Sequence, residues 1–260
     1  MIHPEDLSAA LSAANPLFQE LQSLYRRLPD TQCCCDQPGV CCTFLPEMTW
    51  IEALQWVEII RKLTEEARFD LLKRFMTFYL TSPVRHCGCP FLQHKTCGIY
   101  EFRPFACRAY GLWSRQMGDE RTDVSRRERK ALLTSWQHFG LELPAEMVEF
   151  EIDYCDRVQC RSRPAISDSG LIDILGKVYR LDQNFPELQN IFEKEFYSDF
   201  SFLITSLILG VRKSVLGKFA VIKEMVIQGT SKRLQTMLAR VTTEVSGESL
   251  LMPGTIRPTR

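Results

Sequence analysis

The sequence lacks several features that would identify its function directly. Its eleven cysteines include no pair spaced as C-x-x-C, which excludes the thioredoxin-type redox pair, covalent haem attachment, the usual zinc ribbon and the ferredoxin spacing. The three-cysteine spacing of radical S-adenosylmethionine enzymes is also missing, and no glycine-rich loop follows a strand pattern. The chain therefore contains none of these standard modules.

A charge excess and a long apolar segment are missing as well. The 32 basic residues balance 32 acidic ones, so no global field attracts nucleic acid or anionic lipid, although local basic runs remain. The most apolar stretch, 200–211, has about half the length needed to cross a bilayer. We interpret it as a buried helix and expect no membrane span. Because the start, MIHPEDLSAA, lacks the basic and apolar regions of a signal peptide, we expect a reducing, cytoplasmic location.

Two dense runs of cysteine are what the sequence does contain. TQCCCDQPGVCC holds five cysteines between Cys33 and Cys42, and HCGCPFLQHKTCGIYEFRPFACRAYG holds four more. Consecutive thiols point in different directions on any regular element, so ordinary packing in a core does not explain them. A disulfide framework fits poorly with 260 residues and an odd cysteine count. Clustered soft thiolates are ligands for zinc or iron, and we therefore expect a metal site.

Helical periodicity dominates the rest of the chain. Apolar residues at steps of three and four predict helices over 4–27, 65–80, 131–139, 171–181, 186–196, 200–209, 215–227 and 232–241. Thr49 and Glu52 form a capping-box pattern at the start of a further helix, and Pro144 suits the first residue of another. Since few runs alternate strictly, we expect a mainly α-helical protein with irregular cysteine-rich metal-binding loops.

The chain divides into three regions. Residues 1–165 are expected to form a cysteine-cluster metal-binding region with flanking helices, 166–245 a helical C-terminal region, and 246–260 a flexible tail. The strong basic run from Arg126 to Lys130 contains no aromatic residue. We interpret this run as a solvated helix face and expect no binding to nucleic acid.

The second cysteine run follows a pattern known from a protein family. CPFLQHKTCGIYEFRPFACRAYG resembles the cysteine-cluster proteins of the bacterial YkgJ type, the CxxCxxCC or zinc- or iron-chelating family, whose hallmark is C-P-F-L, a short loop and C-x-I-Y-x-x-R-P-x-x-C-R. The matching residues are Cys89, Pro90, Phe91, Leu92, Cys97, Ile99, Tyr100, Arg103, Pro104, Cys107 and Arg108. Cys41 and Cys42 fit the end of the family's upstream cysteine run, but the spacing before them departs from its pattern. The resemblance covers about residues 33–111.

The resemblance implies a metal centre held by thiolates of both runs. Its candidate ligands are Cys35, Cys41, Cys42, Cys89, Cys97 and Cys107, and which of Cys33, Cys34 and Cys35 takes part is open. A mononuclear site closes with four ligands, so the surplus favours a cluster with spare thiols or two sites. Cys87, Cys155 and Cys160 could complete the ligand set, and His86 and His94 are alternative nitrogen ligands.

Charged and apolar residues surround the second run. Arg103 and Arg108 flank Cys107, where they could stabilise thiolates or pair with surface carboxylates such as Glu101. Phe91 and Phe105 are among the apolar residues that could wrap the loop, and such a shell limits the access of water to a metal.

Metal binding by a cysteine cluster is the expected function. Flagellin lysine methylases, which are related to the family, look like carriers of an iron-sulfur cluster on a similar cysteine set, so we favour that cofactor over a zinc or iron ion. We expect a structural, sensing or metal-handling role with a protein partner that the sequence does not name. The alternative is an enzyme similar to protein lysine methyltransferases, with the cluster as a scaffold. A redox sensor is a third hypothesis, because Cys33, Cys34 and Cys35 would oxidise readily once metal leaves.

Overall fold

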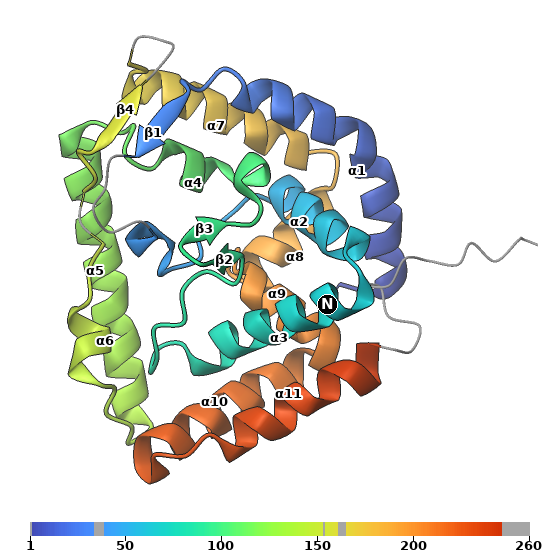
Figure 1. Cartoon of the computed structure of the whole chain (residues 1–260), viewed down its shortest axis with the longest axis vertical. Helices are drawn as coiled ribbons and strands as arrows, with labels where there is room; N and C mark the ends of the chain where they lie inside the picture. Colours follow the sequence, from blue (N-terminus) through green and yellow to red (C-terminus); the bar gives the residue numbers. More distant parts are fainter. Residues whose placement is uncertain (1, 34–38, 153, 161–164, 246–260) are drawn as a thin grey trace, which may run out of the picture.

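The computed structural model describes residues 2–33, 39–152, 154–160 and 165–245 (Figure 1). Within these ranges it has eleven α-helices, two short 3-10 helices and four strands of two or three residues, so the expectation of a mainly α-helical protein is confirmed. The elements in chain order are α1 (Pro4–Tyr25), β1 (Thr31–Cys33), η1 (Val40–Cys42), α2 (Trp50–Lys62), α3 (Glu65–Thr81), β2 (Leu92–Gln93), β3 (Thr96–Cys97), η2 (Tyr100–Phe102), α4 (Phe105–Ala109), α5 (Arg115–His138), α6 (Ala145–Glu149), β4 (Val158–Cys160), α7 (Asp168–Asp182), α8 (Pro186–Glu195), α9 (Phe200–Leu209), α10 (Val211–Gln228) and α11 (Lys232–Val245).

The helices predicted from periodicity are present, with some different ends. The helix expected over 131–139 is the C-terminal part of the longer α5, which also contains the basic run. The helix expected from residue 215 begins at Val211, because the break lies at Gly210, whose φ is 80°. Pro144 caps α6 from outside instead of being its first residue. The predicted tail, 246–260, lies outside the described residues.

An aromatic cluster occupies the centre of the core. Trp56 of α2 and Phe75 of α3 each pack edge to face against both Phe91 and Phe200 of α9, with ring centroids 4.7–5.3 Å apart. Phe91 belongs to the second cysteine run, so the cluster fixes that run against three helices. The core as a whole includes buried side chains from Ile2 to Val241, on both sides of the predicted boundary at 165.

Two buried carboxylates occupy the start of α2. The predicted capping box is present: Glu52 accepts hydrogen bonds from the Thr49 amide at 2.8 Å and from its hydroxyl at 3.0 Å. Asp182, the last residue of α7, accepts from the amides of Trp50 at 3.0 Å and Ile51 at 2.7 Å. The first amides of a helix have no partner within the helix, so these carboxylates satisfy them and tie α7 to α2.

The strands form two small antiparallel pairs. β1 pairs with β4, with Thr31 opposite Cys160 and Cys33 opposite Val158, which brings a late segment of the chain beside the first cysteine run. β2 pairs with β3 as a hairpin within the second run. In Figure 1, α5 and α6 lie along one side of the molecule, and α10 and α11 along its lower edge.

A helix that crosses a membrane must be both long and apolar. In the described part of the chain, no helix meets these requirements by itself. α9 and α10 meet them only as a pair, and that pair is bent by 109° at its junction. Nine residues of α9 are buried, as expected from its interpretation as a core helix.

The buried Asp182 predicts a specific dependence of stability on pH. Burial raises the pKa of Asp182 to about 7, whereas an exposed aspartate titrates near pH 4. Because the folded state binds this proton more tightly, the contribution of Asp182 to stability is fully present below about pH 4 and is lost as the pH rises through about 7. Asp182→Asn removes this titration. Relative to the variant, the wild-type free energy of unfolding should fall over this range by up to about 1.4 kcal/mol per pH unit in urea denaturation.

Asp173→Asn is the matched control. Asp173 also lies on α7, but it is exposed and its pKa is lowered by its hydrogen bond from Lys177 and by Arg27. The contribution of Asp173 to stability is therefore lost as the pH falls, opposite in sign to the pH dependence of Asp182. A wild-type to D182N difference that stays constant between about pH 4 and 7 would contradict the assignment.

Candidate metal centre

The two cysteine runs are held against each other by main-chain contacts. The amide of Cys89 donates to the carbonyl oxygen of Cys42 at 2.6 Å, and the amide of Cys42 donates to Gly39 at 3.0 Å to close η1. Gly39 and Gly88 have φ values of 92° and 69°, a region that favours glycine. A Cβ at Gly39 would lie 3.3 Å from Cδ2 of Leu92. Glycine at these positions therefore allows the loops to approach closely.

A tight hairpin shapes the second run. Leu92 lies opposite Cys97 in the β2–β3 pair, and the Leu92 amide donates to the carbonyl of Cys89 at 2.8 Å. The two turn residues, His94 and Lys95, have φ values of 47° and 65°. Positive φ at both positions is what a two-residue type I′ turn requires. The turn reverses the chain within four residues and returns Cys97 toward Cys89.

The fold gathers four of the six predicted ligands. Cys42 comes from η1, Cys89 from the loop before β2, Cys97 from β3 and Cys107 from α4. Each of the six pairs among these thiols is close enough for the charge of one sulfur to change the pKa of the other. Cys41 lies next to Cys42 and is exposed. Cys35 lies outside the described residues, as does Cys34.

In the described part of the chain, the cysteine sulfurs do not surround one common point at metal-ligand distances. Among the described residues, no three His, Cys, Asp or Glu side chains form a set arranged to hold a metal ion. The donor chemistry nevertheless fits zinc or iron, because four soft thiols are gathered from two loops. Each cysteine has a single side-chain torsion, so its sulfur can turn between staggered positions while the backbone stays in place.

Burial and a thiol pair shift the pKa values of Cys41, Cys42, Cys89 and Cys107. The Cys41 thiol donates to Cys42, which lowers the pKa of Cys42 and raises that of Cys41. Burial raises the pKa of Cys89 to about 11 and also raises the pKa of Cys107. The positive charge of Arg103 opposes the rise at Cys107. Without metal, Cys42 therefore has more thiolate character than Cys41, Cys89 or Cys107.

The two arginines of the motif stabilise the loop in different ways. Arg103 Nε donates to the carbonyl of Tyr100 at 3.0 Å, and its guanidinium lies 3.6 Å above the Tyr100 ring. Arg108 donates to the main-chain oxygens of Arg103, at 2.7 Å, and Glu101. Arg103 thus has the expected electrostatic effect on the thiols, whereas Arg108 mainly ties together the turn before α4.

Glu52 connects the centre to the core. One of its oxygens accepts from the amide of Phe105 at 2.5 Å and from the hydroxyl of Tyr25, and Glu52 is only 3% exposed. Phe105 is the first residue of α4, the helix that carries Cys107. The sequence identified Glu52 only as a capping residue, because Phe105 is 53 positions away and no local pattern joins the two.

The remaining candidate ligands make other contacts. Cys87 is exposed, and its sulfur lies 3.2 Å from the hydroxyl of Thr81 at the end of α3. Cys160 does fold back toward the first run, on β4 opposite Thr31, and Cys155 is half-buried before this strand. The His86 ring packs on Phe150 with centroids 4.4 Å apart, whereas His94 lies in the hairpin turn.

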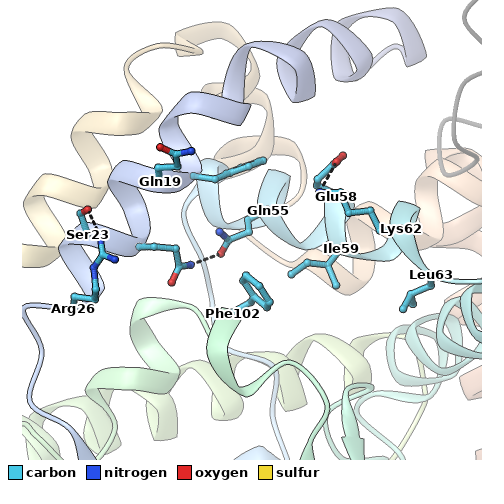
Figure 2. A pocket seen from close by; sticks show the side chains of 11 residues that line it. Gln19, Ser23, Arg26, Gln55, Glu58, Ile59, Lys62, Leu63 and Phe102 are labelled. Atoms are coloured by element: carbon cyan, nitrogen blue, oxygen red, sulfur yellow. Dashed lines mark hydrogen bonds and ion pairs between the residues drawn. The ribbon is translucent and has the colours of Figure 1, made fainter.

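A groove lies between α1 and α2, and Phe102 of η2 is part of its lining. It has a volume of about 670 Å³, and Figure 2 shows the side chains of Gln55, Ile59 and Phe102 converging on it from α2 and η2. Gln22 Nε2 donates to Gln55 Oε1 at 3.2 Å across its floor. The indole of Trp56 donates to the carbonyl of Phe102 at 2.9 Å, which connects the groove wall to the aromatic cluster. The sequence offered no signal for this groove.

The pKa shifts predict an order of thiol reactivity in metal-free protein. A lower pKa leaves more reactive thiolate near neutral pH, so Cys42 should be alkylated before Cys89 and Cys107. Brief treatment with iodoacetamide followed by peptide mass spectrometry measures this order, with urea-unfolded protein as the control. Equal labelling of the three residues in the folded chain would contradict it.

Comparison with known families gives one match. Residues 34–129, just over a third of the chain, match the CxxCxxCC family model, described as "Putative zinc- or iron-chelating domain". No curated protein and no solved structure matches the chain. The matched range includes all four gathered thiols. The match therefore supports the resemblance to the CxxCxxCC family and, with it, zinc or iron chelation by this region.

Proposed function

We propose that this protein binds an iron-sulfur cluster through thiolates of its two cysteine loops. The observation that carries the proposal is the gathering of Cys42, Cys89, Cys97 and Cys107, which are separated by up to 65 positions but lie within electrostatic range of one another. Four cysteine thiolates are the usual ligand set of such clusters. Cys41, and Cys35 outside the described residues, are the further candidates.

The surroundings of the thiols favour a cluster over a single zinc or iron ion. More cysteines are available than one tetrahedral ion needs. Phe91, Ile99 and Phe105 are buried around the loop and would limit the access of water, while Arg103 supplies positive charge beside the thiols. The thiols would release protons on binding, since only thiolates act as ligands.

The biological role that we propose is structural, sensing or metal handling, in partnership with another protein. A protein with an exposed Cys41 and Cys87 suits a reducing compartment, so we place it in the cytoplasm. If loss of the cluster regulates a partner, metal-loaded and metal-free protein should differ in partner binding.

Metal and sulfide analysis of anaerobically purified protein tests the cluster. We expect iron and acid-labile sulfide in equal amounts and a visible absorption band. Zinc without sulfide in a colourless protein would instead establish the simpler ion, and a metal-free protein with an intact fold would overturn chelation itself.

Cysteine variants locate the ligands. Cys89→Ser and Cys97→Ser should each lose most of the bound metal, because both thiols belong to the gathered set. Cys87→Ser is the matched control, because Cys87 lies in the same run but is exposed and forms a hydrogen bond with the Thr81 hydroxyl. Iron content per chain measures the effect, and circular dichroism verifies folding. Equal metal loss in all three variants would contradict the assignment.

The contacts of Glu52 predict that it positions Cys107. Glu52→Gln and Tyr25→Phe weaken the hydrogen bonds that hold the start of α4. Each should therefore lower metal affinity about tenfold, as substitutions of residues that orient metal ligands do. Competition with a chelator measures the affinity. Asp182→Asn is the control, because Asp182 caps the same helix end without contacting α4. Equal affinity loss in D182N and E52Q would assign the effect to general stability.

A lysine methyltransferase-like enzyme is the second candidate function. The observation that favours it is the groove in Figure 2, whose volume suits a small-molecule site. Its lining includes Phe102, the residue before Arg103. Calorimetry with S-adenosylmethionine tests it. Absence of heat from binding would remove this candidate and leave the metal proposal intact.

A further inference from the structure

Positive charge is concentrated in the last two helices. Residues 211–245 contain seven basic and two acidic residues, although the whole chain is balanced. In α10 the only carboxylate is Glu224, which is 6% exposed and accepts from the hydroxyl of Thr230 and the amide of Lys232. Its charge is therefore turned toward the start of α11. No exposed acidic side chain remains on α10 to neutralise its basic residues.

The outward surface of α10 combines these basic residues with exposed apolar ones. Arg212, Leu216, Phe219, Lys223 and Ile227 follow at steps of three and four, so they lie along one face of the helix. Leu216 is 58% exposed and Ile227 60% exposed, while Arg212 and Lys223 are exposed. Large apolar side chains are thus interleaved with cations along about four turns.

The end of α5 extends this surface. The ring of Phe219 stacks on Trp136 with centroids 6.0 Å apart and packs edge to face against Phe139 at 5.5 Å. Phe139 is 67% exposed, and Leu132, one turn before Trp136, is 43% exposed. Figure 1 shows the lower end of α5 meeting α10 at the edge of the molecule. We call the set of Arg212, Leu216, Phe219, Lys223, Ile227, Leu132, Trp136 and Phe139 the basic-apolar face.

We propose that the basic-apolar face docks on the surface of an anionic lipid bilayer. A helix that lies on a membrane places apolar side chains at the boundary with the acyl chains and cations among the acidic headgroups, which is the composition seen here. Nucleic acid would match the cations but leave Leu216, Ile227 and Phe139 exposed to phosphate and water. The face lies on an outer helix at the edge of the molecule, where a bilayer can reach it (Figure 1). The proposal is independent of the metal centre.

Sedimentation with lipid vesicles tests the proposal on the full chain. We expect binding to vesicles of phosphatidylcholine and phosphatidylserine in equal amounts, little binding to phosphatidylcholine alone, and weaker binding at high salt. Arg212→Gln with Lys223→Gln should weaken binding roughly thirtyfold, since each cation near an anionic surface contributes a factor of about five to the affinity. Leu216→Ser with Ile227→Ser should weaken it roughly tenfold or more.

Matched controls change equally exposed residues elsewhere. Ile172→Ser with Tyr179→Ser removes apolar side chains that are 55% and 45% exposed on α7, and Lys62→Gln with Arg115→Gln removes two exposed cations. These variants should bind vesicles like the wild type. Because every substitution is at the surface, circular dichroism should be unchanged throughout.

Several outcomes would overturn the proposal. One is absence of sedimentation with phosphatidylserine vesicles at low salt, and another is equal loss in face and control variants. A concentration-dependent dimer in light scattering that L216S/I227S abolishes would assign the face to a second copy of the chain. Binding to a DNA duplex that R212Q/K223Q abolishes, with no vesicle binding, would assign it to nucleic acid.

Discussion

The amides at the start of α2 are buried and need hydrogen-bond acceptors, and the structure depends on which groups supply them. Glu52 and Asp182 supply the oxygens, and both carboxylates are buried. Glu52 also reaches Tyr25 of α1 and Phe105 of α4, whereas Asp182 brings the end of α7. The start of α2 is therefore joined to three other helices, and a buried carboxylate without these donors would be strongly destabilising.

The candidate metal centre follows from this junction. Phe91 enters the aromatic cluster of Trp56, Phe75 and Phe200 from one side of the second cysteine run. The amide of Phe105 donates a hydrogen bond to Glu52 and so holds the other side of this run. Between these two anchors the hairpin brings Cys97 back toward Cys89, and the main-chain bond between Cys89 and Cys42 adds the first run. Burial of Cys89 and Cys107 disfavours their negative charge, so a cation is the partner that would stabilise them as thiolates.

α5 connects the centre with the basic-apolar face. Its first residues follow the cysteine motif, and its cap, Ser114, is held by Asp168 of α7. Its last turn packs through Trp136 against Phe219 of α10. α5 has no buried residue of its own, so it is positioned by contacts at its two ends, by α6 and by the ion pairs of Arg126 and Arg129 with Glu151.

Sequence patterns determined the helices and the identity of the candidate ligands, because both are local properties. Periodicity located α1, α3, α7 and α9, and the spacing of Cys89, Cys97 and Cys107 identified the second run. Tertiary structure decided which distant groups meet. The contact of Glu52 with Phe105, the capping of α2 by Asp182 and the return of β4 to β1 join residues far apart in the chain, and no local signal encodes such pairs. The groove and the basic-apolar face also arise only when separate helices pack, since a surface belongs to the folded arrangement and not to one segment.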